Sequence, residues 1–157
     1  MTDAAVHQQG GRIFLQLWPA GRVAHPLLHP EGATPIAPSA IAVQGQIFTP
    51  EGMQPYVTPR LLEIDEISEI IHQFQRGAEN ALAAGFDGVE LHGAFDYLID
   101  QLLQDNANQR SDRYGGLLEN RTRLLLEVTE VVTQVWGTKR VGIKPFSQQH
   151  LQRHSRF

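Results

Sequence analysis

The chain has 157 residues, of which 41% are hydrophobic and 19% charged, a composition typical of one globular domain. Its 13 basic and 17 acidic residues give a formal net charge of −4 without a basic run, so we expect no nucleic acid among its partners. There is no cysteine, which excludes disulfides and thiolate metal sites, and no stretch approaches the roughly 20 apolar residues of a membrane span. The first residues lack the pattern of a signal peptide, and we expect a cytoplasmic protein.

The first third of the chain predicts the end of a helix, a strand and a long loop. Residues 2–9 are typical of a helix that Gly10 and Gly11 terminate, and an opening inside an element suggests a start within a longer gene. Residues 12–18 form a nearly continuous apolar run, which predicts a strand buried on both faces, as in a parallel sheet. Eight of the nine prolines lie in residues 19–59, which predicts a long irregular loop of the kind that usually has a function.

The rest of the chain alternates helices with strands. Apolar residues at helical spacing predict long helices over 63–84 and 117–135. Their predicted buried stripes are Ile64, Ile67, Ile70, Ile71, Phe74, Ala78, Ala81 and Leu82 in the first, and Leu117, Arg121, Leu124, Leu125, Val128, Val131, Val132 and Val135 in the second. Two short apolar runs, 86–91 and 140–144, predict strands, with a short helix over 97–103 between them.

This order of elements predicts a parallel sheet. Strands that alternate with helices form βαβ units, in which the strands run the same way. Three strands of one sheet leave two unpaired edges, which proteins normally cover or close, so we expect a fragment of something larger. We therefore predict one incomplete α/β domain over residues 1–146, followed by an unstructured polar tail over 147–157.

Polar and aromatic side chains stand where each predicted strand ends. They are Gln16 with Trp18, His92 with Tyr97, and Lys144. Reactive groups of parallel α/β folds gather at the carboxyl ends of strands, so these side chains are expected to face one pocket for a polar, anionic or carbonyl-bearing ligand. A single His or Tyr at a strand end is more often a local hydrogen-bonding residue, and the pattern alone leaves both interpretations open.

A possible metal pair is discounted. His25 and His29 are four residues apart, the spacing of two ligands on one helix. Pro26 and Pro30 prevent that helix, so we expect no metal site.

Several longer motifs surround the residues at the strand ends. They are GRIFLQLW at 11–18 with GRV at 21–23, APSA at 37–40, FTP at 48–50, GFDGVELHGA at 85–94 with YLIDQ at 97–101, and RSDRYGG at 110–116 with ENR at 119–121. Together these motifs resemble the Old Yellow Enzyme family over residues 3–146. The resemblance implies three central units, strands 3 to 5, of a (β/α)₈ barrel that holds FMN at its carboxyl-terminal mouth. It also implies NAD(P)H as the hydride donor and an activated alkene, such as an enone, as the substrate.

The resemblance implies a role for each residue at the strand ends. Gln16 is similar to the amide that binds the pyrimidine edge of the flavin, and Lys144 occupies the place of an arginine near the flavin. His92 resembles one of two donors to the substrate carbonyl oxygen, which stabilise the enolate as hydride arrives. Tyr97 resembles the proton donor to the α-carbon. Trp18 resembles an aromatic residue of the substrate site, with a core position as the other interpretation.

The sequence departs from the family at three positions that adjoin these motifs. Phe95 stands where the family has a second donor, and the loss of one such donor typically costs about 10²–10³ in rate. Asp96 replaces a glycine, and a carboxylate there is expected to oppose the developing enolate charge. Pro19 stands where the family commonly has histidine after the strand tryptophan.

A further departure concerns the extent of the chain. The phosphate of a barrel-bound cofactor is held by loops after strands 7 and 8, which have no counterpart in this sequence. We therefore expect the chain to need the missing barrel segments or self-association for function. Two hypotheses remain: an FMN-dependent ene-reductase completed by other segments, and a non-catalytic truncated remnant that does not bind FMN alone.

Overall fold

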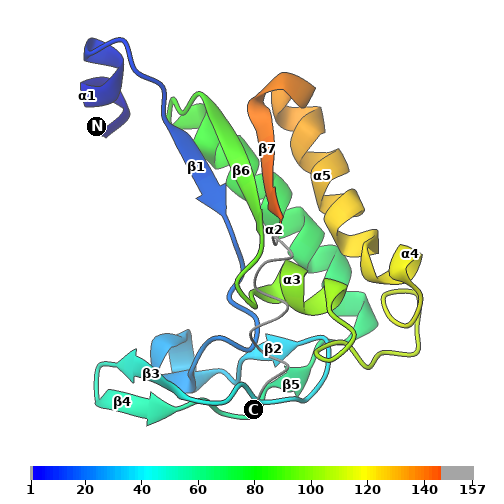
Figure 1. Ribbon diagram of the computed structural model, residues 1–157. Coiled ribbons are helices and arrows are strands. Elements are labelled where there is room, and N and C mark those ends of the chain that lie inside the picture. The colour runs from blue at the N-terminus through cyan, green and yellow to red at the C-terminus, as the bar shows by residue number, and fades with distance from the viewer. Residues whose placement is uncertain (1, 146–157) are drawn as a thin grey trace.

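The computed structural model describes residues 2–145, and the predicted tail over 147–157 lies outside them. At the centre is a three-stranded parallel sheet in the order β1, β6, β7 (Figure 1). These strands are β1 (Phe14–Leu17), β6 (Gly88–Gly93) and β7 (Val141–Pro145). The predicted parallel sheet is confirmed, and each strand lies within two residues of its predicted bounds.

Two long helices cover one face of this sheet. Helix α2 (Ile64–Ala83) precedes β6, and α5 (Arg123–Trp136) precedes β7, and the two helices pack against each other behind the strands (Figure 1). One buried cluster joins both helices to the sheet, and its strand residues are Val89 and Leu91 of the central strand. The hydrophobic core therefore lies between the sheet and these two helices.

Helix α2 agrees closely with its predicted range. Its start carries a capping box, in which the Glu66 side chain accepts the Glu63 backbone N–H at 2.9 Å. The buried residues are Ile67, Ile70, Phe74, Ala78 and Ala81. Ile64 and Leu82 were expected on this stripe but are exposed, because at 3.6 residues per turn both lie roughly 80° around the helix axis from Phe74.

The second predicted helix is divided. Thr122 separates α4 (Leu118–Arg121) from α5, and its hydroxyl donates to the carbonyls of the preceding turn. Leu124, Val128, Val132 and Trp136 form the buried stripe. Leu117 was predicted to be buried but is 73% exposed, because it caps the start of α4 and lies outside the helix.

The segment between β1 and α2 is irregular over much of its length, as predicted, but the prediction missed its short strands. It contains a hairpin of β3 (Gln46–Thr49) and β4 (Gly52–Pro55), together with a short parallel pair of β2 (Ile36–Ala37) and β5 (Arg60–Leu61). Two 3₁₀ turns, η1 (Pro26–Leu28) and η2 (Pro30–Gly32), precede them. This segment lies below the carboxyl ends of the sheet strands (Figure 1).

The remaining elements are short. Helix α1 (Thr2–Gln8) precedes β1, α3 (Leu98–Leu103) follows β6, and the 3₁₀ turn η3 (Thr138–Arg140) leads into β7. The first two confirm the predicted helices at 2–9 and 97–103. The carboxyl end of β6 therefore leads within a few residues to the first turn of α3.

The sheet face opposite the helices, here called the open face, has no described helix on it (Figure 1). Strand alternation directs Leu15 and Leu17 toward the helices and places Phe14, Gln16 and Trp18 on the open face. Phe14 and Trp18 are each 49% exposed. The prediction that this strand is buried on both faces is therefore wrong, since only its helix side is covered by the described residues.

Candidate functional site

The open face brings together residues from all three strands. In the strand register Gln16 is paired with Glu90, and His92 is paired with Lys144. Paired residues of neighbouring parallel strands project to the same side of the sheet. The side chains at the predicted strand ends therefore share one face near the carboxyl ends of β1, β6 and β7.

The Gln16 side chain is hydrogen-bonded to the carboxylate of Glu90, which was not among the predicted site residues. Its Nε2 donates to Glu90 Oε1 at 2.5 Å. Glu90 is half-buried within a strand whose other members are buried. A charged residue in the middle of a buried strand is uncommon and was a signal available in the sequence.

His92 contributes a buried imidazole to the open face. The residue is 3% exposed, and neither Nδ1 nor Nε2 has a hydrogen-bond partner among the described residues. Burial lowers the pKa of His92 below its ordinary value of 6.5, and the positive charge of Lys144 lowers it further, against smaller opposing effects of Glu90, the Ala94 backbone and Asp100. A neutral imidazole keeps one N–H donor and one acceptor nitrogen for a ligand.

Aromatic rings surround this imidazole. The Tyr97 ring centroid lies 5.2 Å from His92 and 4.3 Å from Trp18. Phe95 stacks on His92 at 5.7 Å with the planes 19° apart. Trp18 is half exposed among the described residues, and its ring contacts that of Tyr97.

A strained turn connects His92 to Tyr97. Phe95 and Asp96 have φ values of 56° and 60°, a left-handed conformation that costs a residue with a side chain about 1–2 kcal/mol. The Asp96 carboxylate forms an ion pair with Arg22, with Nη2 and Oδ1 2.8 Å apart. The expectation that Asp96 opposes a developing negative charge is therefore revised, because its own charge is paired.

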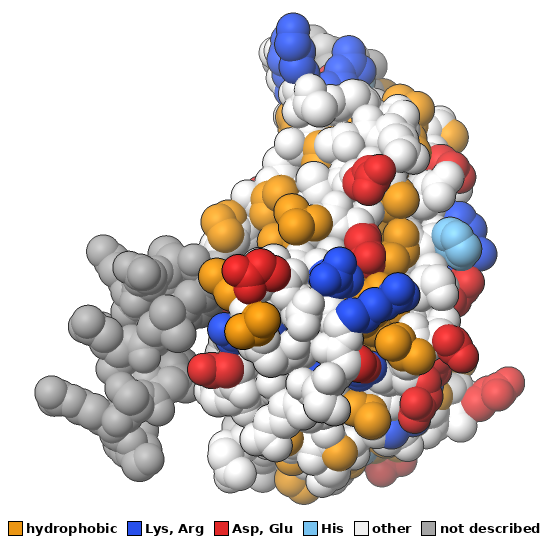
Figure 2. Space-filling view, turned by 90° about the vertical axis from the view of Figure 1, so that its right-hand side faces the viewer, with side chains coloured by type: hydrophobic (Ala, Val, Ile, Leu, Met, Phe, Trp, Pro, Cys, Tyr) orange, Lys and Arg blue, Asp and Glu red, His pale blue; other side chains and the backbone are white. Residues whose placement is uncertain are grey.

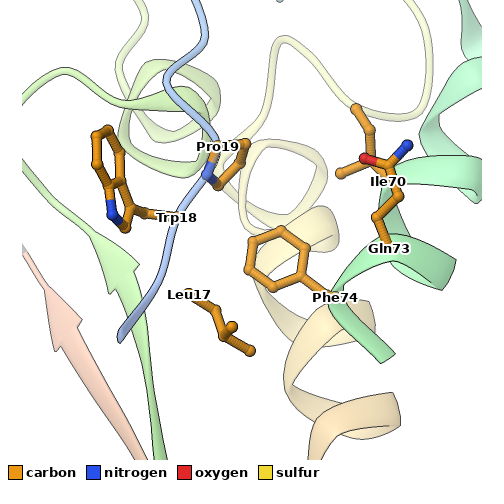
Figure 3. A pocket seen from close by; sticks show the side chains of 6 residues that line it. All are labelled: Leu17, Trp18, Pro19, Ile70, Gln73 and Phe74. Atoms are coloured by element: carbon orange, nitrogen blue, oxygen red, sulfur yellow. The ribbon is translucent and has the colours of Figure 1, made fainter. Parts of the chain in front are cut away.

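A separate cavity of about 220 Å³ lies beside the carboxyl end of β1 (Figure 3). It is lined by Leu17, Trp18, Pro19, Ile70, Gln73 and Phe74. In Figure 3 the Trp18 ring points away from the α2 residues, toward the opposite side of the strand. Apart from Trp18, this cavity shares no residue with the predicted site.

The described residues provide neither a metal cluster nor a membrane helix. Within residues 2–145 there is no group of three or more His, Cys, Asp or Glu residues placed to hold a metal ion. In the same range no helix is both long and apolar enough to cross a membrane. The face seen from the right of Figure 1 mixes acidic, basic and hydrophobic side chains without a large patch of one charge (Figure 2).

Curated relatives cover most of the chain. It is 47% identical over 143 residues to 12-oxophytodienoate reductase 7 of Oryza sativa subsp. japonica, which covers 89% of this chain and 36% of that protein. It is 46% identical over 149 residues to a Leishmania infantum protein named "Probable flavin mononucleotide-dependent alkene reductase", covering 92% of this chain and 40% of that protein. The chain thus spans about two fifths of the length of these relatives.

Solved structures agree with these relatives. Morphinone reductase in complex with tetrahydroNAD has a TM-score of 0.85 and 46% identity, over 90% of this chain and 40% of its own. The old yellow enzyme homologue from Zymomonas mobilis has a TM-score of 0.86 and 44% identity, over 90% of this chain and 39% of its own. The family model described as NADH:flavin oxidoreductase / NADH oxidase matches residues 1–155. The chain belongs to this family, the Old Yellow Enzyme family that its motifs predicted.

Proposed function

We propose that this chain forms one wall of an FMN-dependent NAD(P)H oxidoreductase that reduces the activated C=C bond of α,β-unsaturated carbonyl compounds. In this proposal β1, β6 and β7 are strands 3 to 5 of a (β/α)₈ barrel, which further barrel segments or self-association complete. Family membership supports the class of reaction, and the names of the reductases among the relatives support the class of substrate.

One observation carries the proposal. His92 is buried on the open face with both ring nitrogens unpartnered among the described residues, between strands that present Gln16 and Lys144 on the same face. Buried polar groups are rarely left without hydrogen bonds, and exceptions are commonly explained by a ligand or a catalytic role. An unpartnered imidazole beside an amide and an ammonium suits a ligand that offers carbonyl oxygens.

The donor set also fits a flavin. The Gln16 amide both donates and accepts, as the pyrimidine edge of a flavin requires, and Lys144 supplies a positive charge for that ring system. FMN, when bound, supplies the hydride that reaches the substrate alkene. Gln16 and Lys144 are the residues that would hold and orient its ring.

His92 and Tyr97 are proposed as the catalytic residues. The neutral imidazole of His92 donates its N–H to the carbonyl oxygen of the substrate, where negative charge develops as hydride arrives. The Tyr97 phenol then gives its proton to the α-carbon. Trp18, half exposed against the Tyr97 ring, lines the side of the site that receives the substrate.

A second candidate is a non-catalytic product that does not bind FMN. Phe95 favours it, because the phenyl ring stacked on His92 offers no hydrogen bond to a substrate carbonyl. The half-exposed Phe14 and Trp18 side chains favour it too, since uncovered apolar surface on a sheet is a liability for a stable catalyst.

A flavin titration of the purified chain tests the proposal. Saturable quenching of FMN fluorescence at one FMN per chain, with a raised melting temperature, is the expected result. Gln16→Leu is expected to weaken binding, whereas Gln73→Leu removes an exposed amide from α2 and is expected to leave it unchanged. A chain that melts cooperatively but shows no saturable quenching would overturn FMN binding by the chain or its self-associated form, and would favour the non-catalytic product.

A further inference from the structure

A buried amide ties the loop after β1 to the turn after β6. Gln101 is completely buried, and its Nε2 donates to the carbonyls of Ala20, at 3.3 Å, and Asp96. Its Oε1 accepts the backbone N–H of Arg22 at 3.3 Å. Gly21 makes this approach possible, because a Cβ at that position would lie 2.3 Å from Gln101 Oε1. One side chain therefore fixes the backbone of two loops that are far apart in sequence.

An ion pair joins the same two loops a second time. Arg22 Nε lies 3.1 and 3.2 Å from the two carboxylate oxygens of Asp96, and Nη2 lies 2.8 Å from Oδ1. Nη1 also donates to the Ile41 carbonyl at 3.4 Å. The Arg22 side chain is 12% exposed, so the ion pair is shielded from solvent. The guanidinium is held both by the Asp96 carboxylate and by the Ile41 carbonyl.

The ion pair acts on the strained turn of residues 94–97. Phe95 and Asp96 both adopt the left-handed conformation, which residues with side chains rarely do. The Asp96 N–H donates to the buried Asp100 carboxylate at 2.8 Å. Strain of this kind persists only where the surrounding structure imposes it. Here Asp96 is held through its carboxylate by Arg22, through its carbonyl by Gln101 and through its N–H by Asp100.

We propose that Arg22 and Asp96 are positioning residues, whose ion pair holds the turn in its left-handed form and thereby places Tyr97 against Trp18 and beside His92. The inference rests on the proposed function for the roles of His92 and Tyr97, but the placement itself can be measured without flavin or substrate. Glycine adopts the left-handed conformation freely, so a chain with glycine at position 96 has no need of the ion pair.

The test measures the contact between Trp18 and Tyr97 by nuclear Overhauser spectroscopy of the whole chain. With ring centroids 4.3 Å apart, the native chain gives cross-peaks between the two rings. The variant Arg22→Gln is expected to lose them. The indole resonance of Trp136, whose N–H donates to the Ala78 carbonyl at 3.0 Å in the helix layer, reports that the core is intact.

The rescue variant separates positioning from mere stabilisation. Combining Arg22→Gln with Asp96→Gly is expected to restore the cross-peaks, although the ion pair is absent. Cross-peaks that persist in Arg22→Gln, or that Asp96→Gly fails to restore, would overturn the proposal. Should Arg22→Gln not fold, Arg22→Lys replaces it, because lysine keeps the charge but loses the two-pronged contact, and it is expected to weaken the same cross-peaks. Cross-peaks of full intensity in Arg22→Lys would also overturn the proposal.

The flavin titration is independent of this result. If the chain binds no FMN but the cross-peaks are lost and then rescued, the positioning role of the ion pair is supported and FMN binding by the chain is contradicted. A chain that binds FMN while Arg22→Gln leaves the cross-peaks unchanged retains the proposed function and loses the positioning pair.

Discussion

The ammonium group of Lys144 lies over the ring of Phe95, 5.2 Å from its centroid. Phe95 in turn stacks on His92, so the charge, the phenyl ring and the imidazole form one contiguous group. A cation over an aromatic face is attracted by the electrons of the ring. Phe95 therefore holds Lys144 beside the imidazole whose pKa its charge lowers.

The first prediction concerns the missing donor. Phe95→Asn adds an amide beside His92 at a left-handed position, which asparagine tolerates better than phenylalanine. If the chain reduces enones, turnover is expected to rise by up to about 10²–10³, the effect typical of one oxyanion donor. Steady-state oxidation of NAD(P)H with a cyclic enone measures this. Phe95→Leu is the control without a donor, and equal rates for the two variants would contradict the prediction.

The second prediction concerns the proton donor. Tyr97→Phe keeps the ring against Trp18 but removes the phenol, so turnover is expected to fall about 10²–10⁴-fold while the free energy of unfolding is nearly unchanged. Tyr114→Phe is the matched control, since its hydroxyl donates to Glu127 at 2.9 Å in the helix layer. It is expected to lose about 1 kcal/mol of stability and no turnover. Unchanged turnover in Tyr97→Phe, with reduced turnover in Tyr114→Phe, would show that Tyr97 is not a catalytic residue.

The third prediction concerns the pH dependence of stability. Burial and then the charge of Lys144 lower the pKa of His92 below 6.5 in the folded chain. Between this lowered value and 6.5 the unfolded chain binds a proton that the folded chain does not, so stability falls as pH falls through this interval and is fully present above it. Urea unfolding between about pH 5 and pH 8 measures the effect.

The matched pair for this pH experiment is His92→Asn and His72→Asn. The first variant is expected to flatten the pH dependence, because it removes the buried titrating group. The second removes a histidine from the exposed side of α2 and is expected to leave the slope unchanged. A native slope that survives in His92→Asn would show that another group causes it.

The fourth prediction concerns the close approach of Gly21 to Gln101. Gly21→Ala places a methyl group 2.3 Å from a buried, hydrogen-bonded amide at a left-handed position, and both effects destabilise. Gly32 has a similar φ of 69° with open space around it, so Gly32→Ala isolates the conformational strain. Gly21→Ala is expected to cost about 1–3 kcal/mol more than this control in urea unfolding. Equal losses would mean that Gln101 moves aside at little cost.

Local sequence patterns predicted the elements of the sheet and its helices. Helix α2 was predicted over 63–84 and extends from Ile64 to Ala83, because helical periodicity is a local property that a short stretch of chain expresses completely. The three strands and their parallel order followed from the same local patterns. The shared face of Gln16, His92 and Lys144 followed in turn, since parallel strands bring their carboxyl ends to one edge.

The contacts between loops could not be predicted, because they depend on how distant segments pack together. The ion pair of Arg22 with Asp96 and the hydrogen bond of Gln16 to Glu90 join segments far apart in the chain. The local sequence around each residue does not indicate which residue it will contact. The hairpin of β3 and β4 was missed because prolines indicated an irregular loop, whereas the Thr49 hydroxyl closes its turn by donating to the Gly52 carbonyl at 2.8 Å.

The uncovered side of β1 was missed for a related reason. An apolar run such as 12–18 indicates that a strand can be buried on both faces, but which face is covered depends on where the helices pack. That the ring nitrogens of His92 find no partner among residues 2–145 has the same origin, because the burial and the partners of a side chain are properties of its surroundings. Sequence patterns record what each segment prefers, and the packing of segments against one another decides which groups remain available for a ligand.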